Sequence, residues 1–141
     1  MKIKQVSVFL ENKSGRLQEV LNILAKAEIN IIACSLADTL EFGILRLIVS
    51  EPDKTHKILK TNNYTTNISD VLLISVNNVP GSLLNVLNIL TNAGIGIDYM
   101  YGFSCGDKSF IVLRPEDIEK SIILLNDNNK QLLKEDELFN L

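Results

Sequence analysis

The chain has 141 residues, of which 46% are hydrophobic and 22% are charged, so it can fill a core and keep a polar surface. Its apolar runs are too short to cross a bilayer, its net charge of −3 opposes binding to nucleic acid, and its two cysteines and one histidine offer little material for a metal site. We therefore predict no cofactor, no metal, no membrane and no nucleic-acid partner. Without a secretory signal at its start, we expect a cytoplasmic location.

The predicted elements of the first half follow from its hydrophobic periodicities. Alternation of apolar and polar residues predicts strands, and apolar residues at helical spacing predict amphipathic helices. Asn12 or Ser14 is placed to cap the first helix, and Pro52 suits the first turn of the second. In chain order we predict a strand over 4–10, a helix over 14–27, strands over 31–37 and 43–50 joined by a hairpin at 39–41, a helix over 52–61 and a strand over 64–69.

The second half repeats this order. Gly106-Asp107 supplies turn chemistry between two strands, Pro115 is expected to open the last helix, and Ser69-Asp70 is expected to separate the two halves. In chain order we predict a strand over 71–76, a helix over 81–93, strands over 97–103 and 109–114, a helix over 115–126 and a strand over 130–133. The β-α-β-β-α-β order of each half predicts an α+β fold, made of two ferredoxin-like units with antiparallel sheets and helices on one face.

An internal duplication explains the repeated order. At an offset of 66 residues, NKSGRLQEVLNILAKAEINI (12–31) matches NVPGSLLNVLNILTNAGIGI (78–97) at eleven of twenty positions. Self-similarity of this kind marks a repeated structural unit. We therefore expect one unit over 1–69 and a second over 70–141, and because about 70 residues bury only a modest core, we expect the two to share an interface.

The turn between the first strand and first helix of each unit is the candidate binding element. A glycine there allows an unusual backbone conformation, and the free amides of the helix amino end favour an anion. An asparagine in each turn can accept a hydrogen bond from an ammonium group. A zwitterion would meet donors on one side and acceptors on the other. Glycine or proline at such a junction is also ordinary turn chemistry, and common ancestry would keep a structural turn in both units.

The segment NVPGSLLNVLNILTNAGIGIDYMYGF (78–103) resembles the ACT domain, an amino-acid-sensing module of many regulated enzymes. The family pattern is Asn or Asp, a Pro-Gly turn, Leu, an amphipathic helix ending in Ala-Gly, and a strand that opens Ile-x-Ile. The first unit keeps the glycine and the helix but has Ser14 for the proline and Glu28 for the second glycine. The resemblance covers nearly the whole chain, so the protein is similar to stand-alone tandem ACT proteins, and the departures in the first unit suggest that one site is active and its twin vestigial.

The resemblance implies an amino-acid site at a junction between paired ACT units, against the turn before the first helix, with the second strand contributing. Asp98 is placed to meet an α-ammonium group, although an exposed aspartate at a strand end is equally expected to be solvated. Carried over position by position, the implied ligand-binding residues are Asn12, Lys13, Ser14, Gly15, Arg16, Leu17, Asn30 and Ile31 in the first unit, and Asn78, Val79, Pro80, Gly81, Ser82, Leu83, Ile97 and Asp98 in the second.

Other candidate sites are weaker. Cys34 is expected to be a small core residue, and neither cysteine has a CxxC partner or a nearby histidine. Tyr99, Tyr101 and Phe103 lie at a period of two, as in RNA-recognition modules of the same fold, but the second unit has five Lys/Arg against nine Asp/Glu, a net charge of −4 over 71–141 that opposes RNA. Acylphosphatase-like catalysis would need Arg16 beside Asn12 in a phosphate loop.

We therefore predict a regulatory protein with no intrinsic catalysis that binds one or two free amino acids between its units or between protomers. We expect a homodimer, with an enzyme or a regulator as the partner that receives the signal. The alternative is the regulatory subunit of an amino-acid biosynthetic enzyme, acetolactate-synthase-like, in which the same site acts on a catalytic subunit.

Overall fold

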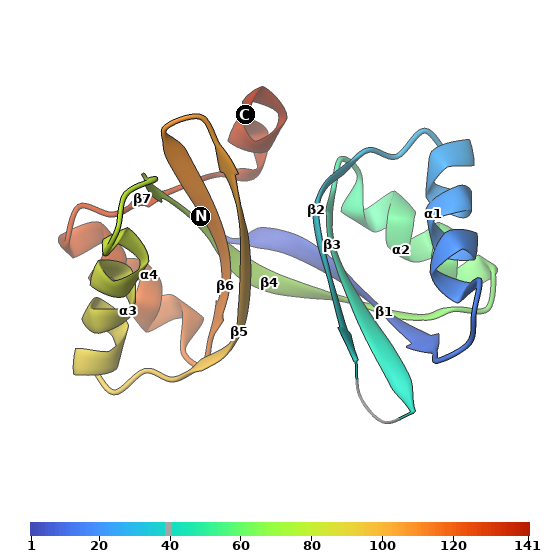
Figure 1. Ribbon diagram of the computed structural model, residues 1–141, viewed down its shortest axis with the longest axis horizontal. Coiled ribbons are helices and arrows are strands. Elements are labelled where there is room, and N and C mark those ends of the chain that lie inside the picture. Colours follow the sequence, from blue (N-terminus) through green and yellow to red (C-terminus); the bar gives the residue numbers. More distant parts are fainter. Residues whose placement is uncertain (39–40) are drawn as a thin grey trace. The chain divides into compact units, whose positions relative to one another are not determined.

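The computed structural model describes residues 1–38 and 41–141, and the chain divides into two compact units. The N-terminal unit comprises Lys4–Ser69, and the C-terminal unit comprises Met1–Ile3 together with Asp70–Leu141. Figure 1 shows the helices of each unit beside its strands. In chain order the elements are β1 (Ile3–Glu11), α1 (Arg16–Lys26), β2 (Ile31–Asp38), β3 (Phe42–Val49), α2 (Pro52–Thr61), β4 (Thr65–Asn77), α3 (Ser82–Asn92), β5 (Ile97–Cys105), β6 (Lys108–Pro115), α4 (Ile118–Asp127), β7 (Gln131–Leu132) and a 3-10 helix (Glu135–Asn140).

The strand order confirms two antiparallel sheets of the predicted type. In the N-terminal unit the strands lie in the order β2-β3-β1-β4, and in the C-terminal unit β5-β6-β4, with β7 paired to β4. Corresponding pairs keep the same register: Asp38 lies opposite Gly43 in the first hairpin, and Ser104 lies opposite Ser109 in the second. The α+β, ferredoxin-like class predicted for both units is thus confirmed. The predicted hairpin at 39–41 includes residues 39 and 40, which lie outside the described part.

Each unit has its own hydrophobic core between its sheet and its two helices. Val20 and Leu24 of α1 are fully buried, and Val86 and Leu90 of α3, each 66 positions later, are buried in the same way. These are the positions that helical spacing directs toward a sheet. Burial of each such side chain contributes about 1.5–3 kcal/mol, so the conserved spacing in the two copies produces two equivalent cores.

Four details of the sequence-based prediction were wrong. The first helix begins after Gly15, which is its N-cap, so neither Asn12 nor Ser14 caps it. Pro115 ends β6, and Asp117 caps the following helix by accepting a hydrogen bond from the amide of Lys120 at 3.0 Å. Cys34 is exposed although it lies opposite the core residue Leu47 on the same face of the sheet, because β2 is the edge strand.

The fourth error concerns the strands on either side of Ser69-Asp70, although the division between the two units does fall there. The two predicted strands over 64–69 and 71–76 form one strand, β4, of 13 residues. Polar residues do not end a strand when their backbone groups find partners. Here the Arg114 guanidinium donates a hydrogen bond to the carbonyl oxygen of Asp70. The chain therefore passes from one unit to the other within a strand.

Candidate functional site: the turn before the first helix of each unit

The two turns adopt the same backbone conformation. Gly15 has φ = 89° and Gly81 has φ = 88°, both in the left-handed region that favours glycine, and each is the N-cap of its helix. A Cβ atom built on either glycine would meet nothing within 4 Å. Glycine is therefore required by the backbone angle, and the space beside each turn is open.

The hydrogen bonds within the turns also correspond. In the first turn the Lys13 amide donates to the Glu11 carbonyl at 2.7 Å, and the Glu19 amide donates to the Gly15 carbonyl at 3.0 Å. In the second turn the equivalent bonds measure 2.9 and 3.0 Å. A glycine N-cap offers no side-chain oxygen to the first amides of either helix, so the electropositive helix ends are not neutralised by their own N-cap residues.

A cavity lies between each turn and the end of the adjacent β-hairpin. The first has a volume of about 240 Å³ and the second about 380 Å³. The first is lined by Leu10, Glu11, Asn12, Lys13, Arg16, Leu17, Leu36, Asp38 and Gly43. The second is lined by Val76, Asn77, Asn78, Val79, Gly81, Ser82, Leu83, Leu84, Gly102, Phe103, Ser104, Ser109, Phe110 and Ile111. Every residue of the first set has its counterpart, 66 positions later, in the second. The duplication has thus preserved a cavity at the turn.

The cavities gather most of the predicted turn residues. Those that line one of the two cavities are Asn12, Lys13, Arg16, Leu17, Asn78, Val79, Gly81, Ser82 and Leu83. Ser14, Gly15 and Pro80 belong to the turns but do not line them.

The candidates from the second strands lie elsewhere. Asn30 and Ile31 lie at the start of β2, and Ile97 and Asp98 at the start of β5, whereas the cavities contact the ends of these strands. The nearest lining residues of these strands, Leu36 and Gly102, lie five residues after Ile31 and four after Asp98. At about 3.3 Å per residue, this is a separation of roughly 13–17 Å. Within one unit, the structure does not bring them together.

The sequence analysis missed the lining residues contributed by the hairpins. Leu36, Asp38 and Gly43 correspond to Gly102, Ser104 and Ser109, and none of these three pairs is identical. Comparison of the two repeats therefore gave no signal at these positions. Only the register of each hairpin brings them to the turn.

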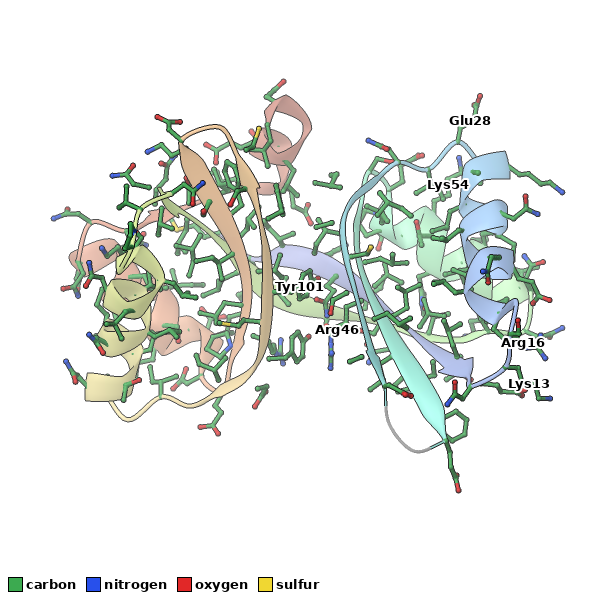
Figure 2. All side chains as sticks on the ribbon, viewed as in Figure 1. Lys13, Arg16, Glu28, Arg46, Lys54 and Tyr101 are labelled. Atoms are coloured by element: carbon green, nitrogen blue, oxygen red, sulfur yellow. The ribbon has the colours of Figure 1, made fainter. Side chains whose placement is uncertain are left out.

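The N-terminal turn carries a network of exposed charges. Arg16 lies 3.1 Å from the Glu19 carboxylate and 3.6 Å from Glu11, and Lys13 lies 3.2 Å from Glu11. The hydrogen bond from Lys13 and the charges of Lys13 and Arg16 lower the pKa of Glu11 below its usual range. In Figure 2, Lys13 and Arg16 lie near each other at the amino end of α1. Arg16 is thus paired with two carboxylates of its own unit.

The C-terminal turn has no charged residue in its cavity. Phe103 and Phe110 stack there with ring centroids 5.2 Å apart, and Ser104 and Ser109 share a hydrogen bond of 3.0 Å across the hairpin. Gly102 takes the place of Leu36, and a Cβ atom on Gly102 would lie 2.7 Å from the Phe110 carbonyl oxygen. The two sites have therefore diverged, one toward charged groups and one toward apolar and neutral polar groups.

Other candidates do not form a site. Among the described residues, no group of three or more His, Cys, Asp or Glu side chains could hold a metal ion. His56 is half-buried, and its Nδ1 atom lies 2.7 Å from the Thr66 hydroxyl. No helix in the part of the chain that the structure describes is both long and apolar enough to cross a membrane.

The duplicated β-α-β-β-α-β fold, with a glycine turn and a cavity in each copy, defines a tandem of small ferredoxin-like modules. The family model for the ACT domain pair matches residues 1–141, and the chain belongs to this family. The resemblance seen in the sequence is confirmed, and the chain is a pair of regulatory modules.

Solved structures agree with this assignment. The chain is 48% identical to a protein from Bacteroides thetaiotaomicron, with a TM-score of 0.95, covering 100% of this chain and 98% of that one. It shares its fold with the ligand-free regulatory subunit of aspartate kinase from Thermus thermophilus, at 13% identity and a TM-score of 0.66, covering 88% of this chain and 91% of that one. It also shares its fold with the aspartokinase α and β subunits, at 16% identity, a TM-score of 0.61 and coverage of 98% and 93%. No curated protein sequence matches the chain.

Proposed function

We propose that this protein is a regulatory sensor that binds a free amino acid in the cavity beside the turn before α1 or α3. One observation carries the proposal: both units keep a left-handed glycine N-cap next to a cavity lined by equivalent residues. Folding alone requires the turn but not an open cavity beside it. We propose no catalytic step, and binding acts by favouring one conformation or assembly over another.

The chemistry of each end of an amino acid fits these turns. The α-carboxylate would lie at the electropositive amino end of the helix. The α-ammonium would donate hydrogen bonds to an acceptor on the other side of the cavity. In the N-terminal cavity this acceptor is the carboxylate of Glu11 or Asp38. In the C-terminal cavity it is the side-chain oxygen of Asn77 or Asn78. An amino acid of about eight to ten heavy atoms can reach micromolar to millimolar affinity with such contacts.

The C-terminal cavity favours an amino acid with an apolar side chain. It is lined by Phe103, Phe110 and Ile111, and by Val79 and Leu84, which are each 60% exposed. Contact with the apolar side chain of a ligand would remove these exposed side chains from water, which lowers the free energy of the complex. The N-terminal cavity also has apolar residues, Leu10, Leu17 and the 53% exposed Leu36, but charged side chains lie beside them.

We further propose that a homodimer completes the site. The candidates at the start of the second strands are too far from the turn cavity of their own unit to share its ligand. A second copy of the chain could supply them, as the resemblance to paired ACT units implies. Analytical ultracentrifugation with and without the ligand would measure the number of copies.

The direct test is calorimetric titration of the full chain with a panel of free amino acids, comparing wild type with two matched variants. Val79→Asp places a negative charge beside the second turn, where it would repel the α-carboxylate. Ile123→Asp introduces the same charge on α4, outside the cavities described above. The Ile123 side chain is 61% exposed, close to the 60% of Val79. We expect at least a tenfold loss of affinity in Val79→Asp, about 1.4 kcal/mol, and none in Ile123→Asp.

Two results would count against the proposal. If no amino acid binds wild type at millimolar concentrations, the turn is only structural. If both aspartate variants bind with wild-type affinity, the C-terminal cavity is not the binding site. Co-purification with a catalytic subunit would favour the alternative, in which the same site regulates a biosynthetic enzyme in trans. The fold that the chain shares with the aspartate kinase regulatory subunit is compatible with both roles, an independent sensor and a regulatory subunit.

A further inference from the structure

A second cavity lies on the other side of the C-terminal turn, next to the segment that follows α4. It has a volume of about 410 Å³ and is lined by Ser75, Val76, Asn77, Val79, Ser82, Asn85, Lys108, Asn129, Lys130 and Gln131. Two of these side chains are cationic, six others carry an amide or a hydroxyl group, and none is acidic. A lining with donors and positive charge but no carboxylate favours an anion.

The two lysines of this cavity are unusual among the lysines of the chain. Lys4, Lys108 and Lys130 are the half-buried ones, and the others are exposed. Lys4 is paired with Asp53 at 3.2 Å, whereas neither cavity lysine makes an ion pair within the described residues. Lys108 is oriented by a hydrogen bond of 2.8 Å to the side-chain oxygen of Asn77. Partly desolvated cations without a counterion are costly, and a bound anion would offset that cost.

The duplication supplies an internal comparison. The equivalent cavity of the N-terminal unit is about 600 Å³ and is lined by Phe9, Glu11, Arg16, Glu19, Asn22, Ile23, Phe42, Asn62, Asn63, Tyr64 and Thr65. There Phe42 and Tyr64 stand where the C-terminal unit has its two lysines, and the one cation, Arg16, is paired with two carboxylates. Only the C-terminal copy of this cavity has positive charge left for a ligand.

We propose that the C-terminal cavity binds the phosphate group of a small molecule, held by Lys108 and Lys130 with the neighbouring amide and hydroxyl donors. A phosphate monoester carries a charge of about −1.5 to −2 at neutral pH and presents three acceptor oxygens, which two lysines and several neutral donors match. The C-terminal unit is acidic overall, so the cavity is a local positive site and not part of a surface for nucleic acid. The cavity shares Val76, Asn77, Val79 and Ser82 with the amino-acid cavity proposed above, but the two lysines line only this one.

The test is titration of the full chain with inorganic phosphate, followed by NMR of the backbone amides and by calorimetry. We expect the amide signals of Asn85, Lys108, Lys130 and Gln131 to shift on binding. Lys108→Phe and Lys130→Tyr place the residues of the N-terminal unit at these positions, and each is expected to weaken phosphate binding at least fivefold. Lys57→Tyr, which removes an exposed lysine outside both cavities, is the matched control and is expected to bind as wild type.

Further titrations identify the class of phosphate ligand. A phosphate monoester that binds more tightly than inorganic phosphate identifies an organic phosphate as the ligand class, and equal affinity identifies free phosphate. Lys130→Gln, which keeps a polar side chain, is the second variant if Lys130→Tyr does not fold, and should also bind weakly. The proposal is overturned if phosphate shifts no signals near the cavity, if acetate binds as tightly as phosphate, or if all lysine variants bind alike. Val79 lines both cavities, whereas the lysines line only this one, so the lysine variants are also titrated with the amino acid. Loss of phosphate binding with unchanged amino-acid binding in these variants distinguishes the two proposals.

Discussion

Glu28 is a residue whose backbone departs from what its side chain favours. It follows α1 with φ = 58°, and the residue 66 positions later, Gly94, has φ = 75°. Left-handed backbone is costly for any residue with a Cβ atom, and glycine after a helix avoids that cost. In Figure 2, Glu28 lies just beyond the end of α1, with its side chain directed outward. The glutamate that weakens the family pattern in the first unit is thus accommodated with strain.

We expect Glu28→Gly to raise the free energy of unfolding by about 0.5–1 kcal/mol, measured by urea denaturation. Gly94→Glu, the reciprocal change, should lower it by a similar amount, and no atom within 4 Å of a Cβ at Gly94 would add a steric clash. Glu28→Ala is the control for the lost charge, because alanine suffers the same backbone strain. Equal stabilisation by alanine and glycine would contradict the explanation.

The Glu19 carboxylate gives a pH-dependent prediction. The Tyr64 hydroxyl donates to it at 2.6 Å, and this bond, followed by that of Arg16, lowers the pKa of Glu19. A lowered folded-state pKa stabilises the protein at pH values above the unfolded-state pKa, about 4.3. That stabilisation is lost as the pH falls through the lower, folded-state pKa.

Tyr64→Phe should therefore raise the pKa of Glu19 toward its ordinary value and reduce the loss of stability on acidification. NMR titration of the side-chain carboxyl carbons measures this pKa directly. Glu11 is the internal control, because its pKa is lowered by Lys13 and Arg16 and should not change. An unchanged midpoint for Glu19 would show that the hydrogen bond contributes nothing to its acidity.

At the scale of elements, the second helices of the two units differ in how they begin. Asp117 caps α4 with its side chain, whereas Glu51, the N-cap of α2, makes no side-chain capping bond. α2 also begins with Pro52 and α4 with Ile118. The two helices share one contact, because Thr55 and Ser121 are fully buried and each donates its hydroxyl hydrogen to the N-cap carbonyl, at 2.8 and 2.6 Å. Comparison of α2 with α4 therefore tests how much the Asp117 side-chain cap contributes to the free energy of unfolding.

We expect Asp117→Ala to lower the free energy of unfolding by about 1 kcal/mol, the usual value of a lost N-cap. Glu51→Ala should change it by less than about 0.5 kcal/mol, since its ion pair with Lys54 is exposed. Denaturant unfolding of the two variants side by side provides the comparison. Similar losses in both would mean that the Asp117 side chain is not acting as a cap.

At the scale of the whole molecule, the duplication has kept the fold and changed the chemistry. The core positions, the glycine N-caps and two cavities recur in both units at the same offset. The residues that line the cavities have diverged in charge, with carboxylates in the N-terminal unit and neutral groups or lysines in the C-terminal unit. Two copies with different linings can recognise different ligands. The proposal for a phosphate group rests on one of these differences, whereas the proposal for an amino acid rests on the turn and cavity that both units keep.

The sequence by itself determined the family, the fold of each unit and most of the turn residues. Hydrophobic periodicity fixes which face of a helix or strand is buried, and the repeat shows which glycines the backbone requires. Only the structure showed that the hairpin ends complete the cavities. Ser104 and Ser109 of the second hairpin line the same cavity as the turn before α3. The structure also decided that one strand serves both units and that two lysines share a cavity. These features depend on strand register and on contacts between distant segments, which local patterns of residues do not encode.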